Sequence, residues 1–358
     1  MIISSITFCR DANLPITSIH VKTLPDPRRY ALSSTNPLVR LAQQSAASAE
    51  LAAALHQALA TGNDVVIEQA LAEASSYAIF RVLSKALEHA LKAPDDSVMH
   101  LRLFAIPILI VTGGRAPAVV PGVVPDIEEV KTLFESHGTL GPIKTFGLSA
   151  SLVSPAGLAA LKFSLLYQRQ RVSALESFPP LDIPPQDLLI ERSEEQAWLR
   201  FMTGVSLTSA DAPGFTETAG NISAWGMAFT RTLADQLTQP GLSLLPIPRL
   251  PASPRQALEE GTFALYELCL QLFLSGALRR FRARAGEPDA AVFACDDASV
   301  RVRLSSPFDT SLSEQYVWPL QPGHDLALVG QAVFSLLDDC RVQNVQLSEA
   351  VEPVSVSH

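Results

Sequence analysis

The chain is poor in cysteine, with residues at positions 9, 269, 295 and 340 among 358. No two of them lie close together and no CxxC pair occurs, which excludes a dense disulfide framework and the ligand spacing of a zinc site. The sequence contains no HxxxH or HExxH motif that would indicate another metal site. We therefore expect neither a metal nor a cofactor. Cys269 and Cys295 lie in apolar runs and are predicted to be small buried side chains in a reducing cytoplasm.

Charged residues are also scarce, at 18 % of the chain, whereas about 25 % is usual for a globular protein. Hydrophobic residues make up 47 %, which excludes a disordered chain and predicts a large buried core. The net charge of −9 argues against a general nucleic-acid binder, because such a protein needs a basic face. The low charge density favours a surface that a partner covers.

No apolar run is long enough for a membrane span. The best candidate, Phe263–Leu278, has 16 residues and includes Glu267 and Gln271, whereas a span needs about 20 apolar residues. The sequence therefore predicts a buried core helix at this position. The first 15 residues lack a basic leader and are interrupted by Arg10 and Asp11, so we expect a cytoplasmic protein without a signal peptide.

The first half of the chain is predicted to contain a hairpin, two helices and a βαβα unit. The hairpin is expected at 2–24, and the alanine-rich helices 37–61 and 64–93 are expected to pack as an antiparallel pair. The apolar strand 103–112 begins the βαβα unit and is predicted to be central, with both faces covered.

That unit continues with a helix at 126–138, capped by Asp126 and Gly138, and a strand at 143–153. Ser154 and Pro155 open a further helix.

A proline-rich run, FPPLDIPPQD at 178–187, is the predicted boundary between two domains, 1–178 and 188–358. Beyond it we expect a short helix around Trp198 and Phe201 and a second helix at 223–238. From residue 242 the predicted order is β-α-β-β-β-α-β, with a long helix from Ser253 to Arg284. Two helices on one face of a ferredoxin-like sheet with an extra strand satisfy that order. The fold class is therefore mixed α/β.

The run YVWPL…AVFSLLDDCRVQNVQL, together with LFAIPILIV…HGTLGP…LVSPAGL, resembles a family of bacterial proteins of unknown function. The likeness lies in the order of segments: a helical N-terminus, an apolar strand followed by a proline-rich loop, and a Trp-Pro-Leu strand before the last helix. This resemblance implies no activity for any individual residue.

Gly113, Gly114 and Arg115 follow the apolar strand and form a candidate ligand-binding loop. Glycines let backbone N–H groups approach an anion, and an arginine adds a bidentate hydrogen-bond donor. The segment matches neither GxGxxG nor GxxxxGK[ST], and the next helix begins well downstream, near Asp126. The sequence favours a plain connecting loop over a ligand site.

Two further patterns are candidates for a catalytic role. GLSAS at 147–151 places Ser149 between a strand and a helix, but Ser151 stands where a nucleophile elbow needs glycine. His324 is the one sensible downstream base, and its neighbour Asp325 is expected to cap a helix. His137 is expected to have a structural role at a helix end. Structural roles are favoured for all of these residues.

Four arginines, Arg279, Arg280, Arg282 and Arg284, crowd the end of the long helix. They form either a solvated helix terminus or a docking patch for an acidic partner.

These patterns predict a non-catalytic interaction or assembly protein, with an acidic protein as a candidate partner and nucleic acid disfavoured. The alternative is a small-molecule or nucleotide-processing enzyme with its site at the loop after strand 103–112. Because the helix at 263–278 is apolar nearly all round, we also expect a homodimer that buries it.

Overall fold

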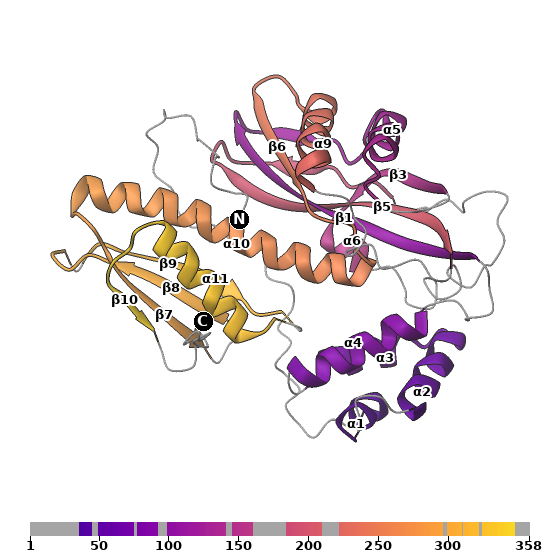
Figure 1. Cartoon of the computed structure of the whole chain (residues 1–358). Helices are drawn as coiled ribbons and strands as arrows, with labels where there is room; N and C mark the ends of the chain where they lie inside the picture. The colour runs from indigo at the N-terminus through magenta and orange to yellow at the C-terminus, as the bar shows by residue number, and fades with distance from the viewer. Residues whose placement is uncertain are drawn as a thin grey trace.

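The computed structural model describes residues 36–44, 49–74, 77–91, 99–140, 145–159, 184–209, 222–295, 299–309, 311–321 and 324–347. The hairpin predicted at 2–24 lies outside the described residues, and the helix predicted from Ser154 and Pro155 is described only as α6 (Pro155–Ala159). The mixed α+β class is confirmed, with a helical unit and two separate four-stranded sheets (Figure 1).

The helical unit contains four short helices where two longer ones were expected. They are α1 (Pro37–Gln44), α2 (Ala49–Ala60), α3 (Asp64–Ala72) and α4 (Tyr77–Leu91). Leucines on α2 and α4 fill the shared core, and small residues such as Ala70 and Ala90 let the helices approach closely. Leu103 and Val205 belong to the same core, so the unit packs on the first sheet at these two residues.

The first sheet has the order β3-β5-β1-β6, and every neighbouring pair is antiparallel. Its strands are β1 (Met99–Gly114), β3 (Thr145–Val153), β5 (Gln196–Ser209) and β6 (Leu242–Pro248). Helices α5 (Ile127–His137) and α9 (Ile222–Leu237) connect β1 to β3 and β5 to β6. This chain order, with β5 and β1 at the centre, is the ferredoxin-like arrangement.

The first sheet differs from three sequence-based expectations. The short helix expected around Trp198 and Phe201 is wrong, because both residues belong to the 14-residue strand β5. The boundary expected at 178–188 falls inside the sheet, since β5 and β6 pair with strands from before it. The ferredoxin-like order, expected after residue 242, lies instead between residues 99 and 248.

Strand β1 is central, as its unbroken apolar run predicts. It lies between β5 and β6, and Ile108 and Leu109 face opposite, fully covered sides. Pro107 is compatible with this position in the sheet. Its carbonyl oxygen faces the side of β6, and its nitrogen faces the same side. The pairing of β1 with β6 ends at Ile108, so no ladder hydrogen bond needs an N–H from Pro107. The missing N–H therefore removes no hydrogen bond to β5.

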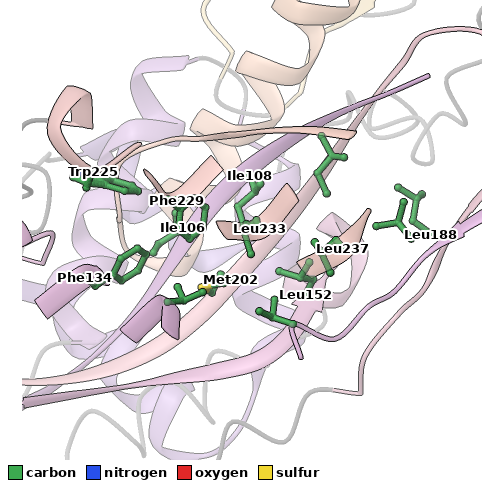
Figure 2. Close-up of a cluster of buried hydrophobic side chains, with 14 of the residues drawn as sticks. Ile106, Ile108, Phe134, Leu152, Leu188, Met202, Trp225, Phe229, Leu233 and Leu237 are labelled. Carbon is green, nitrogen blue, oxygen red and sulfur yellow. The ribbon is translucent and has the colours of Figure 1, made fainter. Parts of the chain in front are cut away.

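One face of the first sheet packs against α5 and α9. Figure 2 shows Trp225 and Phe229 of α9 beside Phe134 of α5, over Ile106 and Met202 of the sheet. The ring centroids of Phe134 lie 5.5 Å from those of Trp225 and 5.4 Å from those of Phe229. Edge-to-face and offset contacts at such distances are favourable beyond the area that they bury. A short ribbon of β2 (Ala118–Val120) and β4 (Leu188–Ile190) completes this core.

The 31-residue helix α10 (Pro254–Arg284) packs against both sheets and runs between them (Figure 1). Its first half covers the opposite face of the first sheet, where a Cβ at Gly261 would lie 3.0 Å from the Cβ of Pro107. Its second half, including Leu270 and Leu274, lies in the core of the second sheet. By length and composition α10 is able to cross a membrane, but more than half of its most apolar window is buried inside the protein.

The second sheet has the order β10-β7-β8-β9, with β10 parallel to β7 and the other pairs antiparallel. The strands are β7 (Asp289–Cys295), β8 (Ser299–Ser305), β9 (Ser313–Pro319) and β10 (Val345–Leu347). Helix α11 (Leu326–Asp339) joins α10 on one face, as expected, over Val300, Val302 and Leu304. The strand order differs from the ferredoxin-like one because β7, β8 and β9 follow one another as a meander.

Candidate functional site

The loop after β1 is held by hydrogen bonds within the protein. Arg115 N donates to the carbonyl of Gly241 at 2.8 Å, and Ala116 N donates to Ser193 Oγ at 3.1 Å. Gly114 has a φ of +116°, and a Cβ there would lie 2.3 Å from the Gly241 oxygen. Glycine is therefore needed at this position for the close approach of β1 to the start of β6.

This geometry favours the connecting loop over an anion site. The N–H groups of Arg115 and Ala116 already have acceptors, so they are not free to bind an anion. The N-terminus of the next helix, α5, is already capped, because the Asp126 carboxylate accepts a hydrogen bond from Glu129 N at 3.0 Å. Ligand binding at Gly113–Arg115 stays a prediction with no support from the described contacts.

The candidate catalytic residues Ser149 and His324 lie in different sheets and do not come together. Ser149 lies in the irregular part of β3, where its Oγ accepts from Ser151 N at 3.2 Å. His324 lies against α10 beside the second sheet, where its Nδ1 accepts from Gln321 N at 3.3 Å. His137 lies within 3.0 Å of the Leu133 carbonyl at the end of α5, which fits the structural role expected for it.

A buried polar cluster lies between α10 and β9. The Tyr316 hydroxyl donates to the Tyr266 carbonyl at 2.9 Å, and Cys269 lies one helical turn from Tyr266. Burial raises the pKa of the Cys269 thiol to about 12 and lowers that of the His324 imidazole to about 4. Both groups are neutral near pH 7, and a protonated thiol is a poor nucleophile. The cluster therefore serves packing.

The four arginines at the end of α10 divide into two pairs. Arg280 binds Glu314 of β9 through two nitrogens, and Arg282 Nε donates to Glu287 at 2.8 Å. Arg279 and Arg284 are exposed, and neither is bonded to another of the described residues. Of the four arginines, two therefore form ion pairs within the chain and two lie in solvent, and a docking role for any of them stays a prediction.

No helix among the described residues covers the face of the second sheet that lies opposite α10 and α11. The inward residues of β8 are the buried Val300, Val302 and Leu304, so Arg301 and Arg303 lie on the other face. We define the open face by six residues in two cross-strand rows: Ala291, Arg303 and Gln315 in one, and Phe293, Arg301 and Val317 in the other. Arg303 and Gln315 are exposed, and Val317 is 40 % exposed.

The loop between β8 and β9 carries the most exposed large hydrophobic side chain among the described residues, Phe308 at 86 %. Ser306 Oγ accepts from Phe308 N and Asp309 N at 3.1 and 3.0 Å. The Asp309 carboxylate accepts in turn from the backbone and hydroxyl of Ser311, and these bonds lower the pKa of Asp309. These hydrogen bonds hold the backbone at Phe308 and Asp309, and the side chain of Phe308 lies in solvent.

The sequence contained a signal for the open face but not for Phe308. SVRVRLS alternates valine with arginine, which predicts a strand that has one apolar and one cationic face. Nothing in the local pattern distinguishes an exposed phenylalanine from a buried one.

No family model, curated protein or solved structure matches the chain. Within the part of the chain that the structure describes, no three His, Cys, Asp or Glu side chains gather as a metal site.

Proposed function

We propose that the protein is a non-catalytic interaction or assembly protein and that it binds a partner protein through the open face of its second sheet. The observation that carries this proposal is Phe308, whose side chain is 86 % exposed in the loop that joins β8 to β9, two strands of that sheet. Full burial of a phenylalanine stabilises a fold by about 1.5–3 kcal/mol, and the described chain does not obtain that stabilisation here. A partner protein that buries Phe308 would provide this stabilisation.

The hydrogen bonds around Phe308 make it an efficient anchor. Because Ser306 and Asp309 already fix the backbone, little conformational freedom remains to be lost when a partner binds. Aromatic and arginine side chains contribute most of the binding energy at protein interfaces, and Arg303 lies on the same hairpin.

The test is photo-crosslinking in the native cell, with a photoreactive phenylalanine analogue in place of Phe308 in the full chain. The matched control carries the same analogue in place of Val65, which is 55 % exposed on α3 in the helical unit. We expect a discrete adduct from position 308 and none of the same mass from position 65.

A second pair of variants ties the adduct to the open face. Arg303→Glu should abolish it, and Arg284→Glu, the same charge change on an exposed arginine of α10, should leave it intact. Equal adducts from positions 308 and 65, or none from either, would contradict the proposal.

A further inference from the structure

We infer that a second copy of this chain pairs with the outer edge of strand β9, so that the second sheets of the two copies join into one. This inference goes beyond the proposed function, because it concerns the edge of the sheet and not its open face. In the strand order, β9 is paired with β8 on one side and with no described strand on the other. Such an edge presents unpaired backbone N–H and C=O groups.

The register of the β8–β9 hairpin shows which residues turn their backbone groups outward. Ser306 N donates to the carbonyl of Leu312 at 3.1 Å, and this pair continues the register of the two strands, which has no bulge. Backbone groups alternate in direction along an antiparallel strand, so every second residue from Leu312 onward points them at β8. The N–H and C=O groups of Ser313, Gln315 and Val317 therefore point away from the sheet. We call these three residues the outer row.

The outer row is accessible. Ser313 and Gln315 are exposed, and Val317 is 40 % exposed. Helix α10 contacts β9 through Tyr316 and Trp318, whose buried side chains point to the covered face of the sheet. No hydrogen bond joins the outward backbone groups of the outer row to another described residue.

The other edge strands of the two four-stranded sheets are blocked. Arg249 N donates to the carbonyl of Pro107 on β1, so the alternate positions of β6 that hold Pro246 and Pro248 point outward and lack an N–H. Residues 122–124 form hydrogen bonds with the edge of β3, and β10 has only three residues. Prolines, covering segments and short strands are the usual protection of an edge. The outer row of β9 has no proline, lysine or bulge, which favours β9 as the edge that pairs.

A second copy fits this edge through a two-fold axis at Gln315. In that antiparallel register Gln315 lies opposite Gln315 of the second copy, and Ser313 lies opposite its Val317. Every N–H of the outer row then meets a carbonyl of the other copy. Pro319, the next outward residue, stays outside the paired stretch. Registers centred further along β9 would use Pro319, whose missing N–H leaves a carbonyl without a donor.

The charges of the two copies are compatible with this edge-to-edge pairing. The outer row is neutral. Glu314 would lie opposite Tyr316 of the second copy, and its carboxylate is already paired with Arg280. The β8 strands of the two copies would be three strand spacings apart, about 14 Å, so their arginines would not face each other. Physiological salt screens exposed charges beyond about 8 Å.

A strand from an unrelated protein fits less well. Strand addition of that kind takes its specificity from pockets for alternate side chains. The outer row offers two exposed polar side chains and one valine, which specify little about an unrelated sequence. Two copies of one strand need no such pocket, because symmetry and Pro319 set their register.

The test measures the mass of the purified full chain by light scattering at micromolar concentration. We expect twice the chain mass of 38.5 kDa. Gln315→Pro removes the central outward N–H of each copy and keeps every N–H that β9 donates to β8. It should raise the dissociation constant of the dimer at least about tenfold. Val317→Lys places a charge at the seam, as natural edge strands do, and should also weaken the dimer.

Leu328→Lys is the matched control, because it places the same charge on an exposed side chain of α11 and should leave the dimer intact. Amide hydrogen exchange locates the contact. The amides of Gln315 and Val317 should exchange more slowly as the protein concentration rises. The amide of Leu244, at an outward position of β6, should not change. Circular dichroism and melting show which variants fold, and the exchange measurement needs no variant.

A monomer mass for the unmodified chain would overturn the inference. A dimer that both Gln315→Pro and Val317→Lys preserve would also overturn it, as would a dimer in which the amides of the outer row stay unprotected, because each places the contact elsewhere. The proposed function fails separately. A dimer with a protected outer row and no adduct at position 308 would support this inference and contradict the proposed function, and a monomer with a discrete adduct would do the reverse.

Discussion

Arg280 of α10 and Glu314 of β9 form a bidentate ion pair. It joins the second half of the long helix to the edge strand of the second sheet. Arg280 Nε donates to Glu314 Oε1 at 2.7 Å, and a second nitrogen donates to Oε2. The two side chains are only 19 % and 22 % exposed. An arginine that the sequence marks as a docking candidate thus stabilises the fold.

This pair predicts unequal effects of two arginine substitutions on the same helix. Arg280→Ala leaves the Glu314 carboxylate partly buried without its partner, so it should lower the free energy of unfolding by about 1–3 kcal/mol. Arg284→Ala removes an exposed cation and should change it by less than about 0.5 kcal/mol. Urea denaturation of both variants measures the difference, and equal midpoints would show that the ion pair contributes nothing.

The apolar helix that motivated a homodimer is internal. Leu270 is fully buried in the core that α10 shares with the second sheet, although Glu267 and Gln271 are partly exposed, as their spacing predicts. A homodimer through this helix surface therefore loses its main argument, and the oligomeric state stays a prediction to be tested by light scattering.

Leu270→Lys should yield unfolded or aggregated chain, because a buried unpaired charge costs more than about 4 kcal/mol. Leu328→Lys, on the 50 % exposed side chain of a leucine in α11, is the control and should fold normally. Circular dichroism and light scattering measure both. A folded monomer from Leu270→Lys would restore the interface interpretation.

Gly114 offers a test of the loop after β1. Gly114→Ala should destabilise the protein by about 3 kcal/mol, because a Cβ meets the Gly241 carbonyl at 2.3 Å and φ is positive. Gly138→Ala has the same sign of φ but no atom within 4 Å, so it should cost only about 1 kcal/mol. Thermal unfolding of the two variants separates steric clash from backbone strain.

Local signals in the sequence predicted helix ends well. Ser253 and Pro254 open α10 where expected, and Asp325 caps α11 by accepting from Ala327 N at 2.9 Å. Asp126 caps the N-terminus of α5, and Gly138 caps its C-terminus. These features depend on residues within one helical turn of each other, so the sequence alone is sufficient to locate them.

Strand β5 was missed because both of its faces are apolar. Phe201 faces α10 and Met202 faces α9, so the alternation that marks a half-exposed strand is absent. Arg200, which is 9 % exposed and donates to the Leu199 carbonyl, further obscures the pattern. Its pairing partners on β1 lie more than 80 positions away, as in Thr112 with Gln196, and no local rule reveals such a distance. The strands that this sheet takes from both sides of the predicted boundary at 178–188 pair over the same long distances.

The buried His324 should make the free energy of unfolding depend on pH. Its ring lies 5.6 Å from that of Phe263, its Nδ1 accepts from Gln321 N, and no carboxylate among the described residues pairs with it. Burial lowers its pKa from 6.5 to about 4, so the folded protein binds fewer protons than the unfolded chain between these values.

The contribution of His324 is therefore complete above pH 6.5 and is lost as the pH falls towards 4, by a total of about 3 kcal/mol. We expect the urea midpoint of the unmodified protein to fall over this window more steeply than that of His324→Gln, whose side chain does not titrate. The comparison must be made between the two proteins, because they share every other titrating group of the chain. Parallel profiles for the two would show that the imidazole is solvated in the native state and that the aromatic cluster on α10 does not exclude water from it.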